Sequence, residues 1–489
     1  GAANLTGFRL SGDKYPRYFE HGFYGDFARA PYLMEAEWKA ADMTGQRVHI
    51  LHPEGGHPCL SNAAFLKFVP MDNAEVLSEL ADRENKANKR LIAVHDMHSA
   101  FYYNNPQTSD DIAAELEPLG ESDAGHVMLE YYADVRDPAF THNFFVSMDG
   151  YGCFTGEGDL FFHTARAGFV RRGEDFYAAF ADYAHELGLK VGFSYRMNMF
   201  AAQPPWDVGF NTVIYREHPE WRCIDRDGSE IARLSYAFPE VSGIVVDLFR
   251  RMIRSGCDGV HLLFCRGVPN LLYEKPLTDA FARETGLDAF SLAEEDERYI
   301  DFRCRYFTEY FMIPLKKAVT EEAEKLGRAK PPFISVHALA DRRTNRFFAL
   351  DLEDWARRGL IDIAVGYPSV MTSPEDFCYN KQLSVDLAFY AGLKRFGVET
   401  GADILPRGVG PEEIVRRANQ VYDAGLDYVA LWDTNSYTAR KTFWPVVRRL
   451  GHRELLKTPG ALPERPARYI RVTKMNGLKL DKYNPWWCL

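Results

Sequence analysis

The feature that most constrains the fold is a regular alternation of short apolar runs with segments of helical period, which extends from Arg90 to Gly451. The apolar runs are rich in Val, Ile and Phe, and runs of this kind separated by amphipathic helices are typical of a parallel sheet covered by helices. Eight such runs suit a closed (β/α)8 barrel, the TIM barrel, better than an open sheet. The predicted strands are 91–96, 127–132, 190–195, 259–264, 333–337, 361–366, 395–399 and 428–432.

The segments between the predicted strands show the residue pattern of a helix and its C-terminal end. Between the second and third strands, Phe180 and Ala184 lie on one apolar stripe, and Gly188 follows at a position suited to a left-handed residue. The order of helix, glycine, polar residue and strand recurs at Gly256 and Gly425. This recurrence is the helix-to-strand half of a barrel repeat.

The two ends of the chain do not follow the alternation. Residues 1–89 contain Gly-, Pro- and His-rich loops, and we expect them to form a small β-rich or irregular subdomain beside a barrel of residues 90–451. Residues 452–489 are expected to form a linker and a short C-terminal extension with one strand near 469–472. The apolar run Val48–Leu51 needs a partner surface, so we expect the N-terminal part to pack against the barrel.

The composition excludes several classes of partner. Of the 489 residues, 46% are hydrophobic and 26% are charged, and a net charge of −11 without an extended Lys/Arg-rich stretch argues against nucleic acid. No run approaches the ~18 apolar residues of a membrane-spanning helix. The eight cysteines form no C-x-x-C pair, so the sequence predicts neither a zinc knuckle nor a disulfide framework. We expect no metal, no cofactor and no membrane partner.

The native compartment and the oligomeric state stay open at this point. The first residues, Gly1 to Asn4, have neither the basic nor the apolar region of a signal peptide. A cytoplasmic protein and an exported protein whose signal peptide lies outside this sequence are both compatible with this start.

Side chains at the carboxyl ends of barrel strands and in the following loops meet at one mouth, so functional candidates follow from the strand ends. Rings, hydroxyls, amides and fixed cations suit sugar binding there, although an indole such as Trp432 can equally pack beneath the rim. We assign substrate binding to His95, Asp96, Tyr132, Arg196, Asn198, Arg266, His337, Tyr367 and Trp432. The acids in these positions include Glu130, Asp134, Glu274, Asp341, Glu399, Asp403 and Asp433.

Hydrolysis of a glycosidic bond needs one protonated and one ionised carboxyl group on either side of the bond. We predict Glu399 as the nucleophile or base, because it closes the predicted seventh strand. We predict Glu274 as the acid, in a loop that folds back over the mouth. The alternatives are a salt bridge for Glu399 and a solvated loop position for Glu274. In that case the catalytic role falls to three other acids: Asp433, Glu130 and Asp134.

Three sequence words occur in order around the third and fourth predicted strands. They are His218-Pro219-Glu220-Trp221, then Leu234-Ser235-Tyr236-Ala237, and then Asp258-Gly259-Val260-His261-Leu262. In this order they resemble the words of the uncharacterised glycosyl-hydrolase-like barrels of bacterial genomes, over about 184–269. The resemblance implies a TIM barrel and carbohydrate chemistry on an oligosaccharide or glycoside.

One position departs from that family. The common fourth-strand word continues with an acid, "HLD", where this chain has Leu263. The resemblance therefore implies the loss of the usual strand-four carboxylate. Either Glu274 supplies the acid instead, or the site binds sugar without cleaving it.

Two other functions remain open beside a glycoside hydrolase. A metal-dependent hydrolase on the same barrel would recruit His95, His98, His337 and Asp433. However, His95 and His98 are three residues apart and point to opposite faces of an extended strand. A non-catalytic sugar-binding barrel would keep the aromatic and polar groups without a working acid pair.

Overall fold

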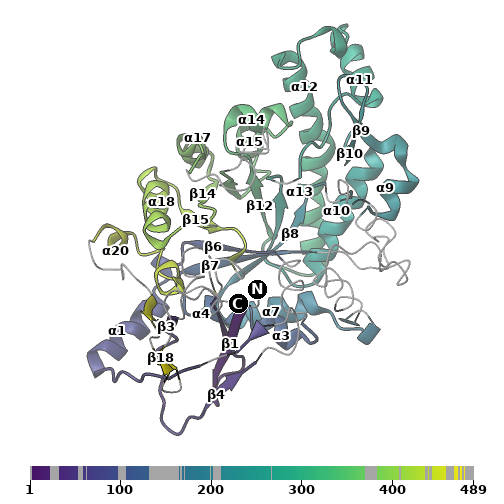
Figure 1. Ribbon diagram of the computed structural model, residues 1–489. Coiled ribbons are helices and arrows are strands. Elements are labelled where there is room, and N and C mark those ends of the chain that lie inside the picture. The colour runs from purple at the N-terminus through teal and green to yellow at the C-terminus, as the bar shows by residue number, and fades with distance from the viewer. Residues whose placement is uncertain are drawn as a thin grey trace.

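Eight parallel strands close into a barrel in the computed structural model, which describes residues 3–21, 32–52, 59–61, 63–96, 106–131, 165, 168–169, 171–198, 200–201, 207, 211–265, 267–368, 383–406, 409–434, 439, 443–458, 467–471, 474–475 and 478–479. Each strand pairs with the next, and the eighth pairs with the first (Figure 1). The predicted TIM barrel is therefore confirmed. The strands are β6 (Leu91–His95), β7 (Ala124–Glu130), β8 (Lys190–Arg196), β11 (Gly259–Leu263), β12 (Phe333–Ala338), β13 (Ile363–Gly366), β14 (Glu399–Asp403) and β15 (Tyr428–Leu431).

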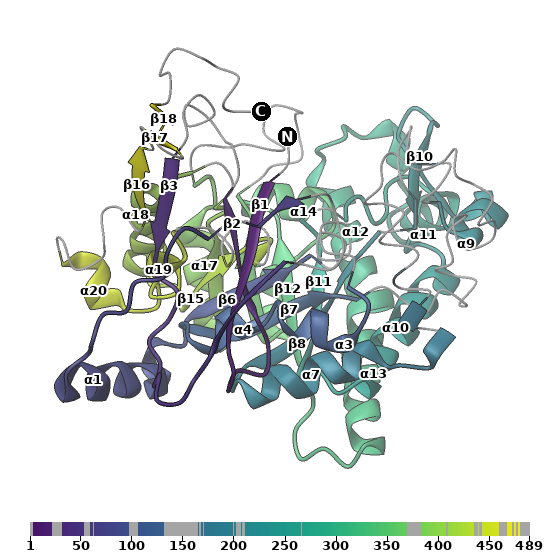
Figure 2. The ribbon, with the colours of Figure 1, turned by 60° about the horizontal axis from the view of Figure 1, so that its bottom comes forward.

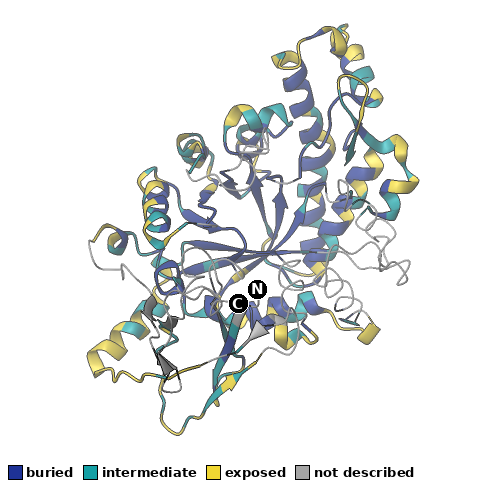
Figure 3. Ribbon diagram, in the orientation of Figure 1, coloured by how far each residue is buried: buried dark blue, intermediate teal, exposed yellow. Residues whose placement is uncertain are grey.

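Side chains along each strand alternate between the inside of the barrel and the layer beneath the helices, as the two-residue period of a strand requires. On β6, Ile92 and Val94 pack in the interior with Met128 of β7. Leu91 and Ala93 belong instead to the core between strands and helices. The barrel strands are buried along almost their whole length (Figure 3). The last inward position of each strand therefore decides which side chain reaches the mouth.

Helices surround the strands on the outside (Figure 1). The longest α-helix among the described residues, α10 (Pro239–Arg254), starts with a proline where no N–H is needed and buries Val241, Val245 and Met252. Gly256 follows it in the left-handed region with φ 97°, as predicted. The other helices include α3 (Ser109–Ala113), α4 (Glu117–Gly120), α7 (Phe176–Glu186), α9 (Val213–Glu217), α11 (Lys275–Thr285), α12 (Glu297–Phe307), α13 (Ile313–Lys325), α14 (Arg342–Phe347), α15 (Leu352–Arg357), α17 (Leu387–Leu393), α18 (Pro411–Asp423), α19 (Trp444–Val447) and α20 (Arg453–Lys457).

Acidic residues mark the amino ends of several strands. Asp258, Asp362 and Asp427 each lie between a helix-ending glycine and the strand that follows it. Each carboxylate accepts a hydrogen bond from a backbone N–H of the neighbouring strand. The donors, in the same order, are Val191 at 2.7 Å, Ile334 at 2.7 Å and Thr400 at 3.0 Å. Acids at this end of the barrel therefore have a structural role, since they satisfy strand N–H groups.

The predicted position of the seventh strand is wrong. Residues Lys394–Phe396 form a 3₁₀ helix, which Gly397 ends with φ 83°, and β14 begins only at Glu399. The apolar side chains that suggested an earlier strand belong to the connection between helix and strand. Glu399 thus lies at the amino end of the barrel, and its Oε2 accepts a hydrogen bond of 3.1 Å from the Tyr428 hydroxyl. The residue at the carboxyl end of this strand is Asp403.

Strands from both ends of the chain form small sheets beside the barrel. β1 (Ala3–Leu10) pairs with β2 (Arg17–His21), β4 (Val48–Leu51) and β5 (Cys59–Leu60). β3 (Tyr32–Ala36) pairs antiparallel with β16 (Ala467–Arg471), which overlaps the strand expected near 469–472 (Figure 2). Two further short strands, β17 (Lys474–Met475) and β18 (Leu478–Lys479), pair antiparallel with each other. The N-terminal and C-terminal segments are therefore joined by backbone hydrogen bonds.

The N-terminal part packs against the barrel, but through other residues than the sequence suggested. Tyr15 belongs to the main core and meets Tyr183 of α7 edge to face, with ring centroids 4.5 Å apart. Glu79 pairs with Arg448 at 3.6 Å. The apolar strand β4 is held by its backbone pairing with β1, and its Ile50 stays 53% exposed.

Within the described residues, no helix combines the length and the apolar character needed to cross a membrane.

One contact between the N-terminal part and the barrel depends on protonation of His452. Its Nδ1 lies 2.7 Å from the Asp123 carboxylate, and its Nε2 contacts Asp82 of α1 (Asn73–Glu84). The hydrogen bond with Asp123, helped by Asp82, raises the pKa of His452 from 6.5 to about 9. A raised histidine pKa adds stability that is full below the unfolded pKa and is lost as pH rises through the folded pKa.

We predict that the thermal unfolding temperature falls as pH rises from 6.5 to about 9, and that His452→Gln flattens this fall. Differential scanning fluorimetry across this pH range measures both effects. His49→Gln, which removes an imidazole on β4 outside this contact, serves as the control for the substitution itself. Equal slopes for His452→Gln and the unsubstituted protein would contradict the prediction.

Candidate functional site

The inward rows of the eight strands end in a mixed set of charged, aromatic and apolar side chains at the carboxyl end of the barrel. Nearly all of them are buried, so they interact in surroundings of low polarity. Two clusters of contacts organise the set, one around Arg196 and one around His337. The members are Asp96, Glu130, Arg196, Leu263, His337, Tyr367, Asp403 and Trp432.

The first cluster joins two carboxyl groups through one guanidinium. Arg196 Nε contacts Glu130 Oε1, and its terminal nitrogen lies 3.4 Å from Asp96 Oδ2. Burial raises the pKa of Glu130 from 4.5 to about 8; Arg196 lowers it and the Asp96 carboxylate raises it further. Burial outweighs the guanidinium here, so Glu130 keeps its proton at neutral pH.

The second cluster contains a fully buried pair. His337 Nε2 lies 3.5 Å from Asp403 Oδ2, and both side chains are 0% exposed. The other oxygen of Asp403 accepts a hydrogen bond of 2.7 Å from the N–H of Leu405. Leu405 has φ 39°, a left-handed conformation that costs energy for a side chain of this size, so the chain bends sharply just after the strand. This bend places a backbone donor on the Asp403 carboxylate.

Three rings pack against one another beside this pair. The ring centroids of His337, Tyr367 and Trp432 lie 5.4–5.6 Å apart in edge-to-face contacts. One layer deeper, His261 is hydrogen-bonded to Ser335 Oγ at 2.8 Å, and burial lowers its pKa to about 3. The floor of the mouth is therefore aromatic, and His261 beneath it is neutral.

The eighth strand ends in an unusual backbone conformation. Asp433 follows Trp432 with φ 51°, one of three positive values found among the described residues other than glycine. Its side chain is 0% exposed. The carboxyl group is therefore buried at the end of the strand, at a residue whose backbone conformation is strained.

The structure gives Asn198 a structural role instead of the predicted substrate-binding role. Its side-chain amide donates to the carbonyls of Leu234 and Pro269, both at 2.8 Å, and accepts from the N–H of Leu234 at 3.0 Å. The amide nitrogen and the amide oxygen of Asn198 are thus both hydrogen-bonded to backbone groups. They tie the end of β8 to the strand β10 (Glu230–Leu234).

Glu274 is also structural in this fold. It precedes α11 and is 1% exposed, and its carboxylate accepts N–H bonds from Leu272 at 2.9 Å and Ile224 at 3.0 Å. Burial raises its pKa, while these backbone donors lower it. The loop is hydrogen-bonded to the hairpin of β9 (Arg222–Ile224) and β10 through this carboxylate.

The predicted pair of Glu399 and Glu274 is therefore not brought together by the described contacts. Glu399 lies at the opposite end of the barrel from the mouth, and Glu274 holds a loop. His95 is the next residue after Val94 on β6, so the alternation places it on the outer side of the strand. Three predicted residues, Tyr132, Asp134 and Arg266, lie outside the described residues.

No group of three or more His, Cys, Asp or Glu side chains suited to a metal ion occurs in the described part of the chain. His337, one of the ligands considered for a metal site, is paired with Asp403, and His98 lies outside the described residues.

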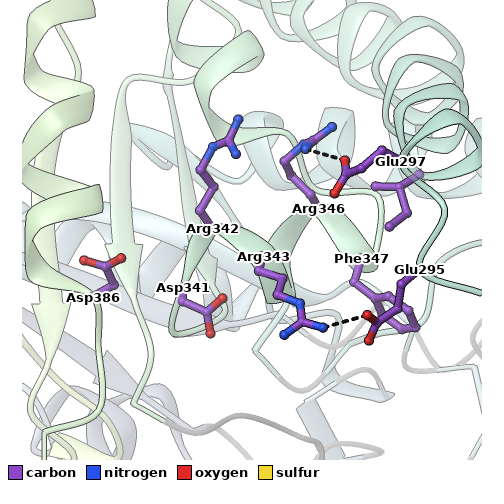
Figure 4. Close-up of a pocket in the computed structure, with 9 residues that line it drawn as sticks. Glu295, Glu297, Asp341, Arg342, Arg343, Arg346, Phe347 and Asp386 are labelled. Atoms are coloured by element: carbon purple, nitrogen blue, oxygen red, sulfur yellow. Dashed lines mark hydrogen bonds and ion pairs between the residues drawn. The ribbon is translucent and has the colours of Figure 1, made fainter.

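A separate charged cavity of about 350 Å³ lies beside α14 and α12 (Figure 4). Its charges are used within the protein: Arg343 pairs with Glu295 at 2.7 Å and Arg346 with Glu297 at 2.9 Å. Asp341 caps α14 through the N–H of Thr344. The lining residues are Glu295, Glu297, Ile300, Asp341, Arg342, Arg343, Arg346, Phe347 and Asp386, and none belongs to the two clusters at the mouth.

No protein-family model and no curated protein matches the chain. Solved structures match at low identity. The catalytic domain of a β-amylase from Paenibacillus polymyxa is 10% identical with a TM-score of 0.41, over 72% of this chain and 94% of that one. A β-galactosidase from Halorubrum lacusprofundi is 13% identical with a TM-score of 0.46, over 76% of this chain and 58% of that one.

An α-galactosidase from Thermus thermophilus is 14% identical with a TM-score of 0.36, and the match covers 71% of this chain and 58% of that one. The chain thus spans less than two thirds of the length of both galactosidases. At these scores the likenesses assign no activity, and the fold rests on the closed eight-stranded barrel itself.

Proposed function

We propose that the protein hydrolyses glycosidic bonds of an oligosaccharide or glycoside at the mouth of the barrel, with Glu130 as the proton donor. The observation that carries this proposal is the burial of Glu130, 2% exposed at the carboxyl end of β7, which raises its pKa to about 8. A carboxyl group that is still protonated at neutral pH can donate its proton to the departing sugar oxygen. The contact with Arg196 fixes the orientation of this carboxyl group.

Asp403 is the second carboxyl group of the proposed pair. It ends the seventh strand, the place for which Glu399 was expected; its carboxylate accepts a hydrogen bond from the Leu405 N–H and lies 3.5 Å from His337 Nε2. A backbone donor on a carboxylate suits a group that acts in its ionised form, as a nucleophile or as the base that activates water. Asp433 on the next strand is the alternative, and Asp134, outside the described residues, is a further one.

The buried floor supports both roles. Trp432, Tyr367 and Leu263 exclude water beneath the acids, and low polarity is what keeps a carboxyl group such as Glu130 protonated. Arg196 and Asp96 are the polar groups proposed to bind sugar hydroxyls beside it. Their side chains retain exposures of 22% and 10%, so they face the accessible side of the cluster.

One observation favours a second function, a barrel that binds sugar without cleaving it. Leu263 is the inward residue at the carboxyl end of β11, so the fourth strand contributes no acid to the mouth. If this strand must supply a carboxylate, the remaining side chains can bind a glycan but cannot cleave it. Binding without turnover across a broad glycan panel would support this second function over the first.

We predict that Glu130→Gln lowers kcat by about 10²-fold or more, because the amide cannot donate the proton to the leaving oxygen. The purified chain is first screened on p-nitrophenyl glycosides and on polysaccharides with a reducing-end assay. Steady-state kinetics of the variant on the best substrate then measure the loss.

Two matched controls locate the effect. Glu399→Gln removes an acid at the opposite end of the barrel and should leave kcat close to that of the unsubstituted protein. Glu274→Gln weakens a buried acceptor of backbone N–H groups, so it should cost about 1–3 kcal/mol of stability without abolishing turnover. Near-full turnover in Glu130→Gln would move the acid role to another residue, and loss of turnover only in Glu399→Gln would overturn the placement of the site.

The raised pKa of Glu130 also predicts that stability and activity both fall as pH rises, in successive pH ranges. As the acid, Glu130 must be protonated, so kcat/KM should fall above about pH 8. Between 4.5 and about 8 the folded protein holds a proton that the unfolded chain has lost, so this group makes stability fall as pH rises. Thermal melts should show that Glu130→Gln is less sensitive to pH across this range; an unchanged slope would contradict the assigned pKa.

A further inference from the structure

The helix α1 packs with its polar face toward the barrel. Glu79, Asp82 and Arg83 are its partly buried residues, and Glu79 pairs with Arg449 at 3.2 Å while Asp82 contacts His452. No residue of the helix is buried. A surface helix of a globular protein ordinarily turns its apolar stripe inward and its charges outward, so this orientation is the reverse of the usual one.

The apolar face of α1 is exposed to solvent. Val76, Leu77 and Leu80 lie within one third of a turn of each other on the side of the helix next to its docked polar face, and Leu77 is 67% exposed. The segment that leads into the helix is equally apolar and equally exposed (Figure 3). Together they form what we call the apolar patch: Phe65, Phe68, Val69, Met71, Val76, Leu77 and Leu80, each between 40% and 70% exposed.

We propose that the apolar patch is the interface of a symmetric dimer of this chain. Exposed apolar groups gathered in one region are unusual on a monomer and mark interaction surfaces, whereas single exposed apolar residues such as Ile50, Phe290 and Leu326 need no partner. An isologous interface brings the same patch of two copies together, so an apolar patch is complementary to itself.

The size of the apolar patch suits this partner. With roughly 100 Å² of exposed surface on each side chain, the seven residues offer on the order of 700 Å², close to the ~800 Å² per partner of a standard interface. Removing this area from water supplies the driving force for association.

The charges at the border of the apolar patch favour a second copy over a lipid surface. Asp72, Glu75 and Glu84 lie beside it on or next to α1, and Lys67 lies within the leading segment, 3.5 Å from Glu35. Peripheral membrane helices instead carry a surplus of Lys and Arg that is attracted to anionic headgroups. A border with both signs of charge can pair with itself across a two-fold axis.

The position of the apolar patch leaves the barrel mouth accessible in both copies. The helix α1 docks on Asp123 through His452, and Asp123 directly precedes β7, at the amino end of the barrel. The clusters of Glu130 and Asp403 lie at the carboxyl end. Dimerisation through α1 therefore does not depend on the proposed function and does not cover its site.

Sedimentation velocity of the full chain from about 1 to about 100 µM tests the proposal. We expect a concentration-dependent species of twice the 55.9 kDa chain mass. Leu77→Glu and Phe68→Glu, one on the helix and one on the leading segment, should each weaken the dimer at least tenfold. Leu326→Glu, at a residue 46% exposed after α13, is the matched control and should leave dimerisation unchanged.

Circular dichroism melts confirm that each variant is folded, and Phe68→Glu carries the test if Leu77→Glu does not fold. A monomer throughout the concentration range would overturn the proposal, as would a dimer that both variants leave intact. Binding of the monomer to phosphatidylcholine vesicles, lost in Phe68→Glu, would overturn it in favour of a membrane surface.

Discussion

The rest of the structure depends on the hydrogen bonds that close the barrel, which join β15 to β6 in register at Val429 with Leu91 and Leu431 with Ala93. Closure leaves no free strand edge and aligns all eight strands in parallel. Because the strands are parallel, residues remote in sequence come together at each end. The Arg196 and His337 clusters, with the rings of Tyr367 and Trp432, exist only because this closure brings seven different strands to one mouth.

The two ends of the barrel use acidic residues in opposite ways. At the amino end, Asp258, Asp362 and Asp427 accept strand N–H bonds, and their carboxylates serve the fold. At the carboxyl end, Glu130 is buried where desolvation outweighs its cation, and its pKa rises to about 8. A carboxyl group held protonated by burial lowers stability as pH rises. Such a cost is typical of functional sites and rare in groups that only stabilise a fold.

Two polar residues with a predicted functional role are structural in this fold, because they are hydrogen-bonded to the backbone of buried loops. Asn198 and Glu274 both lie near the carboxyl ends of strands, where a functional role is reasonable from the sequence. In the fold their polar atoms bind the backbone of Leu234, Leu272 and Ile224. A buried loop must have its N–H and carbonyl groups paired, so side chains of this kind are used to complete the loops that follow β8 and β11.

The sequence by itself determined the barrel, because the alternation of apolar runs and helices repeats eight times and each strand is buried on both faces. It also held the information to place Glu399, since Gly397 is followed by an acid after one residue, in the same spacing as Gly425 and Asp427. What only the tertiary structure decided was the pairing of Glu130 with Arg196 and the outward face of α1. Contacts between distant segments have no local pattern in the sequence, and they depend on how closed strands and docked helices meet in space.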